Sequence, residues 1–199
     1  MARIKLDTTK IESVTRQVTL EGAKDLMLDR YAGDNNTRLE WYQKLYFDLD
    51  GETLVLPALN IMSFLSAHNT NSAPKRLKDK RKFKDFCNAC LSYIDINPQR
   101  IPITRDGQPI KFGRIQGEAD PKSGVYLHRA VARLDKGIPN PKERPVIPTP
   151  WAISFALTIT PNSEIQEQEV INIFDGGGIA IGLGTFRGVF GKFKVTQWD

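Results

Sequence analysis

Residues that serve metal and redox chemistry are scarce in this chain. It has two cysteines, Cys87 and Cys90, and two histidines, His68 and His128. A zinc site would need two more ligands at a workable spacing beside the Cys-x-x-Cys pair, and neither histidine belongs to a paired ligand motif. We therefore expect two free thiols, with no bound metal, disulfide or cofactor. Free thiols fit a reducing compartment, the cytoplasm.

Catalytic signatures are missing as well. The sequence contains no Gly-x-Ser-x-Gly, no His-Glu-x-x-His and no defensible pair of carboxylates. His68 follows a predicted helix and His128 lies within a predicted strand. With a lysine or tyrosine nearby, either could do acid–base work on RNA. No paired arrangement is visible, so we predict no catalytic residue.

Long apolar runs are also absent. A membrane-spanning helix needs about 20 consecutive apolar residues, whereas the longest stretches here are short, as in Leu54–Leu59 and Trp151–Ile159. The first ten residues are charged and lack the apolar region of a signal peptide. With 40% hydrophobic and 26% charged residues, the composition is that of an ordinary globular protein. We expect one domain that does not contact a membrane.

Positive charge is concentrated in one stretch, residues 75–84, which we call the basic segment. It holds seven bases and one acid, whereas the rest of the chain carries a net charge of −1 out of a total of +5. Such a segment either contacts a polyanion or is a solvated helix face. It begins a predicted helix with an apolar face formed by Leu77, Phe83, Phe86, Cys87, Cys90 and Leu91. The predicted phosphate contacts are Lys75, Arg76, Lys80, Arg81, Lys82 and Lys84.

Hydrophobic periodicity predicts an α+β fold. Asp50-Gly51 between two apolar runs predicts a hairpin, and Ser163 is expected to cap a helix that Gly176–Gly178 end. Residues 136–150 contain five prolines, so no regular element is expected there. The stronger elements are strands at 11–20, 125–134, 151–160 and 189–198, and helices at 57–67 and 164–175.

In chain order these elements read strand, helix, strand, strand, helix, strand, which is the ferredoxin-like (RRM-like) βαββαβ order. We expect an antiparallel sheet built from the four strands, with both helices on one face. The rest of the single domain, 1–199, would then be insertions at about 29–56, 69–124 and 135–150.

The glycine-rich segment near the end of the sequence is its most specific feature. It is neither a Walker A motif nor a dinucleotide fingerprint, because no Gly-Lys-Ser/Thr follows and a strand follows in place of a helix. Two interpretations remain. Its exposed N–H groups could bind phosphate oxygens, or the glycines could allow a tight connection packed on the sheet. The predicted phosphate contacts are Gly182, Gly184, Arg187, Gly188 and Lys192.

Arg187 has two interpretations of its own. It could form a bidentate pair with a phosphate, or tie the loop to a nearby carboxylate such as Asp175. Aromatic rings that could stack on RNA bases, or could instead pack inward, are Trp41, Tyr42, Tyr46, Phe186 and Phe190.

Two stretches carry a resemblance to a known family. A helix followed by IAIGLGTFRGVFGKFKV resembles the C-terminal glycine-rich loop of the RAMP superfamily, the ferredoxin-like RNA-binding proteins of CRISPR effector complexes. VTLEGAKDLMLD is similar to their first strand and turn. The layout also resembles small phage and prophage proteins, on Arg144-Pro145, Trp151–Leu157 and Gly182–Val195. RAMP nucleases commonly use a histidine near the N-terminal strand and helix, and this chain has none before His68.

The resemblance implies a non-catalytic RNA-binding protein of cytoplasmic location. Its implied partners are single-stranded RNA and either further copies of itself or a CRISPR-type complex, which a phage-encoded copy would enter by mimicry. One alternative is an RNA endonuclease of the same fold that uses His68 or His128. The other is a phage structural or assembly protein without a nucleic-acid role.

Overall fold

The computed structural model describes residues 12–34, 36–68, 72–133 and 139–199. Within them, β1 (Val14–Gly22) lies between β10 (Phe193–Trp198) and β9 (Ala152–Ile159), and β4 (Ile94–Asn97) pairs with the other edge of β9. All three pairings are antiparallel. These pairings confirm the predicted antiparallel βαββαβ core. Residues 11 and 134, which belong to predicted strands, lie outside the described residues.

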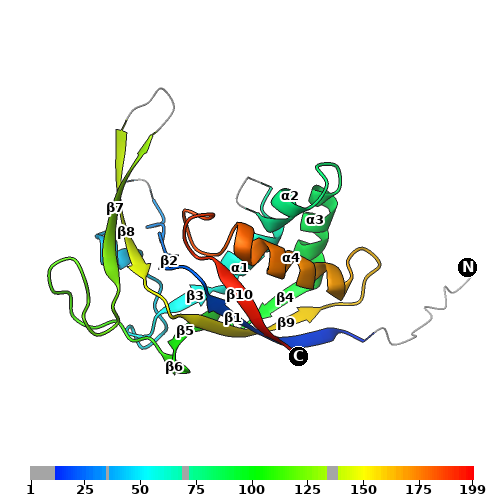
Figure 1. Cartoon of the computed structure of the whole chain (residues 1–199), viewed down its shortest axis with the longest axis horizontal. Helices are drawn as coiled ribbons and strands as arrows, with labels where there is room; N and C mark the ends of the chain where they lie inside the picture. Colours follow the sequence, from blue (N-terminus) through cyan, green and yellow to red (C-terminus); the bar gives the residue numbers. More distant parts are fainter. Residues whose placement is uncertain (1–11, 35, 69–71, 134–138) are drawn as a thin grey trace, which may run out of the picture.

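Four helices cover one face of this sheet (Figure 1): α1 (Ala58–Ser66), α2 (Ala73–Leu77), α3 (Phe83–Tyr93) and α4 (Glu167–Ala180). The core between helices and sheet is aromatic. Phe64 of α1 lies 5.4 Å from Phe174 of α4 and 5.5 Å from Phe193 of β10, measured between ring centroids. Tilted aromatic pairs at these distances add stability beyond the area that they bury.

The strand predicted at 125–134 is present, but its predicted place in the core sheet is wrong. β7 (Tyr126–Arg133) belongs to a second, three-stranded sheet with β2 (Leu26–Met27) and β8 (Pro139–Ile147). The second strand of the core is instead β4, in a stretch expected to be an insertion. Alternation in the sequence identifies a strand but does not choose its partner, and β4 is only four residues long. Figure 1 shows the β7–β8 hairpin projecting away from the helices.

β8 also corrects the expectation that residues 136–150, of which 136–138 lie outside the described residues, form no regular element. Its three prolines, Pro139, Pro141 and Pro145, stand at alternate positions of the strand. The carbonyl of Pro145 accepts from the N–H of Leu28, on the edge away from β7, at 3.1 Å. Alternate residues point their N–H groups to the same edge, so all three missing donors face away from β7 and the ladder with β7 stays intact.

Helix α4 begins later and ends later than expected. Gln166, and not Ser163, is its N-cap, and Gln166 and Glu169 form a capping box. Gly176–Gly178 do not end it, because the helix continues to Ala180. A Cβ at Gly177 would lie 2.5 Å from the Phe64 ring, and one at Gly178 would lie 2.6 Å from the Phe193 carbonyl oxygen. These two glycines therefore serve close packing of α4 on α1 and β10.

Three further strands extend the same sheet beyond β9: β5 (Arg100–Arg105) pairs with β9, and both β3 (Val55–Pro57) and β6 (Gln108–Pro109) pair with β5. A short 3-10 helix, η1 (Trp41–Lys44), lies in the segment between β2 and β3. The predicted hairpin at Asp50-Gly51 is confirmed by an antiparallel bridge between Phe47 and Leu54. Residues 113–124 are organised by the buried Asp120, whose carboxylate accepts from the N–H of Gly113 at 2.7 Å and the Ser123 hydroxyl at 2.5 Å.

Candidate nucleic-acid interface

The basic segment covers the end of one helix, a turn and the start of a second helix, and not the start of one long helix. α2 ends at Leu77 and α3 begins at Phe83. Asp79 holds the turn between them: its carboxylate accepts from the N–H of Arg81 at 2.7 Å, and its carbonyl accepts from the N–H of Lys82 at 3.0 Å. Aspartate readily forms such local bonds with the backbone, and here they replace helical ones.

The apolar face predicted for this helix is only partly correct. Phe83, Phe86 and both cysteines are buried, as expected. Leu77 and Leu91, by contrast, are 42% and 59% exposed. Because the chain turns between α2 and α3, Leu77 is no longer in helical register with the residues of α3.

Lys78 fixes the basic segment to the body of the protein. Its Nζ lies 2.8 Å from the Glu169 carboxylate on α4 and 4.2 Å from the centroid of the Phe86 ring. The hydrogen bond from Lys78 lowers the pKa of Glu169. This one cation is thus used inside the structure, and it holds the turn in place.

The other cations of the segment point outward. All six phosphate contacts predicted in the basic segment are exposed. Lys75 donates to the carbonyl of His68 at 3.2 Å. The others have no ion-pair partner among the residues that the structure describes; they are Arg76, Lys80, Arg81, Lys82 and Lys84. A dense row of cations that form no ion pair with a carboxylate is a surface suited to a polyanion.

The glycine-rich loop uses its N–H groups internally. Those of Gly182, Gly184 and Gly188 donate to the Gly177 carbonyl (3.0 Å), the Asn60 side chain (2.9 Å) and the Ile181 carbonyl (2.6 Å). The N–H of Thr185 donates to the Met27 carbonyl of β2 at 2.8 Å. These bonds favour the interpretation of a tight connection, in which the loop ties α4 to β2 and to the second sheet. Phosphate binding through the glycines stays a prediction. Lys192 is half-buried.

Arg187 is directed toward the protein. Its Nε donates to the Gly184 carbonyl at 3.1 Å, and a terminal nitrogen lies 3.4 Å from the Asn60 carbonyl and from the Ser63 hydroxyl of α1. Burial lowers the pKa of Arg187 to about 10. These contacts favour the structural role of Arg187. They join it to α1 and not to Asp175.

We accordingly expect Arg187→Ala to destabilise the fold by roughly 1–3 kcal/mol, because the carbonyls of Gly184 and Asn60 lose a charged donor in a part-buried place. Thermal melting measures this change. Arg187→Lys, which keeps the charge and loses the fork geometry, serves as the matched variant. An unchanged melting temperature together with weaker RNA binding would instead establish the phosphate role.

Only one of the five candidate stacking rings is largely exposed. Trp41 is buried, and Tyr42 and Tyr46 pack against the core. Phe186, at the outer side of the glycine-rich loop, is 51% exposed and lies 6.0 Å from Phe190. Phe186 is therefore the ring of this group that can stack on a base without rearrangement.

The two histidines stand against aromatic rings. His128 lies 5.3 Å from Phe190 and thereby links β7 to the glycine-rich loop, and His68 lies 6.2 Å from Phe83. Across the described ranges, no group of three or more histidine, cysteine or acidic side chains could hold a metal ion. No helix in the described part of the chain is long and apolar enough to cross a membrane.

Cys87 and Cys90 are fully buried in α3. Burial raises the pKa of the Cys87 thiol to about 11 and also raises that of Cys90. Since the thiolate is the reactive form, we expect the native protein to resist iodoacetamide at neutral pH and the guanidinium-unfolded protein to react at both sites. Mass spectrometry of the two samples checks this. Labelling of the native protein at the unfolded rate, or one zinc ion per chain after careful purification, would contradict the prediction of inert, metal-free thiols.

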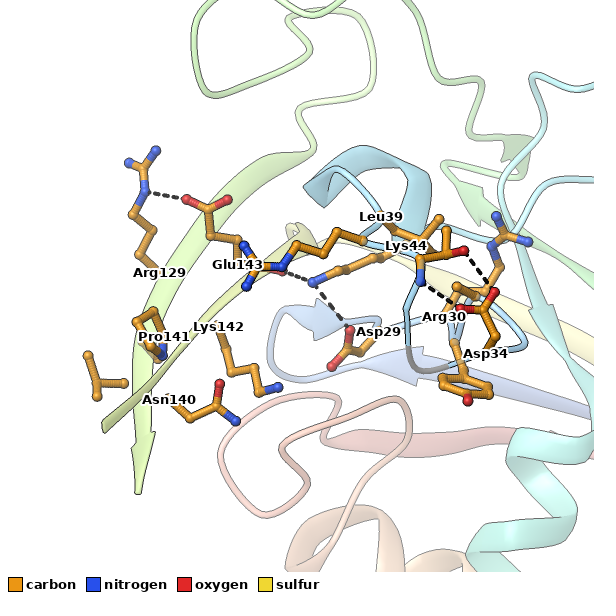
Figure 2. A pocket seen from close by; sticks show the side chains of 16 residues that line it. Asp29, Arg30, Asp34, Leu39, Lys44, Arg129, Asn140, Pro141, Lys142 and Glu143 are labelled. Carbon is orange, nitrogen blue, oxygen red and sulfur yellow. Dashed lines mark hydrogen bonds and ion pairs between the residues drawn. The ribbon is translucent and has the colours of Figure 1, made fainter. Parts of the chain in front are cut away.

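A third surface was missed by the sequence analysis. A groove of about 990 Å³ runs between residues 29–44 and the β7–β8 hairpin (Figure 2). Five cations and three acids line it. These residues come from stretches about 100 positions apart, and no short window of the sequence shows them together. The feature of the sequence that could have indicated this surface is the group of three bases in the turn-rich segment after β2: Arg30, Arg38 and Lys44.

The comparisons with known proteins concern the fold. No family model and no curated protein matches the chain. Among solved structures, it is similar to a chain in "Cryo-EM structure of the Type III-B Cmr-beta bound to cognate target RNA". The TM-score is 0.52 at 10% identity, over 94% of this chain and 60% of that one. This chain thus spans about 60% of the length of the chain that it matches. The likeness shows the fold alone, and it agrees with the α+β, ferredoxin-like arrangement of the core.

Proposed function

We propose that the chain binds single-stranded RNA as a non-catalytic protein of RAMP-like fold. The observation that carries the proposal is the basic segment, where five exposed cations of α2, α3 and the turn between them have no ion-pair partner among the described residues. Phosphate contacts provide most of the sequence-independent affinity for nucleic acid. The solved structure of similar fold is that of a complex bound to RNA, which adds support.

We also propose that the protein is phage-encoded and acts in an assembly, either as copies of itself along one strand or within a CRISPR-type effector complex. Static light scattering with and without RNA tests the first arrangement, because mass should rise in steps of one chain as the RNA lengthens. A mass that stays at one chain per RNA of any length would exclude assembly of copies along the strand.

The test of RNA binding is a titration of labelled single-stranded RNA, followed by fluorescence anisotropy at several salt concentrations. Binding through phosphates predicts a log–log slope of about −0.7 per contact. No binding at low salt would contradict the proposal and leave a structural or assembly role. Integrity of the RNA after incubation tests the endonuclease alternative: cleavage that His68→Ala or His128→Ala abolishes would establish it.

A further inference from the structure

The groove between residues 29–44 and the β7–β8 hairpin has two walls, which come from different parts of the chain. Figure 2 shows Asn140 and Lys142 of β8 on one wall and Asp29, Arg30 and Asp34 on the other. Asn140 and Lys142 lie two residues apart on one strand and so share a face of it. The groove is thus formed where the second sheet meets the segment that follows β2.

The three acids of the groove are all engaged. Asp29 lies 2.6 Å from Arg144 and 3.7 Å from Lys44. Glu143 accepts from Arg129 at 2.9 Å. The carboxylate of Asp34 accepts from its own turn, including the Thr37 hydroxyl at 2.7 Å, and these bonds lower its pKa.

Three cations of the lining are left over: Arg30, Arg38 and Lys142 have no ion-pair partner within the described ranges. Arg30 donates its Nε to the Gln43 carbonyl at 3.1 Å, which orients the guanidinium. Arg38 is exposed, and its side chain forms no hydrogen bond or ion pair with the described residues. The lining therefore has an excess of positive charge that is available to a ligand.

Apolar surface lies beside these cations. Tyr31 and Val131 are 62% exposed, and both line the groove with Leu39. Exposed aromatic rings next to arginines are the combination that takes unpaired bases together with their phosphates. A free phosphate would need only the cations. The volume of about 990 Å³ is at the upper end of the range of roughly 300–1,000 Å³ for ligand pockets, which suits an extended ligand.

We propose that this groove is a second contact surface for the same single-stranded RNA, with phosphates at Arg30, Arg38 and Lys142 and a base against Tyr31. The inference rests on the proposed RNA binding but names residues separate from the basic segment. The strand would be held along the outer half of the β7–β8 hairpin as well as at the basic segment between α2 and α3.

The test compares two double variants by RNA anisotropy over a range of salt. Arg38→Glu/Lys142→Glu changes the groove. Arg114→Glu/Lys194→Glu makes the same change of charge at two exposed residues outside it. We expect the groove variant to lose on the order of 10-fold more affinity than the control, and its salt slope to fall by about 1.4, the share of two phosphate contacts. Equal affinity in the two double variants would overturn the groove and leave RNA binding intact.

Tyr31 supplies a test that involves no change of charge. Tyr31→Ala should weaken binding on the order of 10-fold, whereas Tyr31→Phe should keep it, because stacking needs the ring and not the hydroxyl. RNA that carries 4-thiouridine should crosslink on irradiation to the peptide of residues 29–44. Crosslinks that fall only outside this peptide and β7–β8, or equal loss with alanine and phenylalanine, would contradict the proposal. If the unaltered protein shows no salt-dependent binding of RNA, the proposed function itself is contradicted.

Discussion

Replacing Lys80, Arg81, Lys82 and Lys84 by glutamate is expected to lower the affinity for single-stranded RNA on the order of 100-fold at moderate salt, by the loss of phosphate contacts. The log–log salt slope should fall by about 2.8 if all four are contacts, at roughly 0.7 each for single strands. The fold should be unaffected, because all four side chains are exposed and no ion pair within the described residues is broken. Fluorescence anisotropy and a melting curve measure both quantities.

A control separates a local contact from a general effect of net charge. Arg114, Lys122 and Lys194 are also exposed and without an ion pair among the described residues. Their joint replacement by glutamate should change the salt slope far less per charge than the change in the basic segment. If both variants retain the affinity of the unaltered protein, the basic segment is only a solvated face.

Gly184→Ala is expected to destabilise the protein by roughly 2–5 kcal/mol, from strain in the left-handed conformation and from overpacking. Gly184 has a φ of +76°, and a Cβ there would lie 2.3 Å from the Met27 carbonyl oxygen. That oxygen also accepts the N–H of Thr185, so moving it away breaks the link between the loop and β2. For a chain of this size the melting temperature should fall by about 10 °C.

Gly188→Ala is the matched variant. Its φ is +89°, but a Cβ at that position meets nothing within 4 Å. Only the conformational strain remains, at about 1–2 kcal/mol. Equal losses at Gly184 and Gly188 would show that the close approach to β2 has no cost and would reopen the interpretation in which these glycines face a ligand.

Local pattern was sufficient for several elements and for the charge of one surface. The alternation of Trp151–Thr160 predicted β9 because a half-buried strand must alternate, and it does so between buried and less buried positions. The density of bases in residues 75–84 predicted an exposed segment, since that many charges cannot be buried without partners. The βαββαβ order followed from the sequence of elements, even though one strand was assigned wrongly.

Other features depended on contacts between distant residues. Whether Gly176–Gly178 end α4 is decided by Phe64 and Phe193, which lie against the helix and favour residues without a side chain. Arg187 contacts α1, more than 120 positions earlier in the chain. Nothing local in the sequence distinguishes such an arginine from one that faces a phosphate.

The sequence by itself thus determined several of the strands and helices, among them β1, β9, α1 and α4, and where the positive charge is exposed. Both depend on the periodicity and density of neighbouring residues. The tertiary structure alone decided that β4 and not β7 completes the core sheet, and that a groove forms beside the β7–β8 hairpin. Strand pairing and grooves are made by residues that are far apart in the sequence, about 60 positions for β4 and β9 and about 100 for the groove. Their meeting is set by packing of the whole chain.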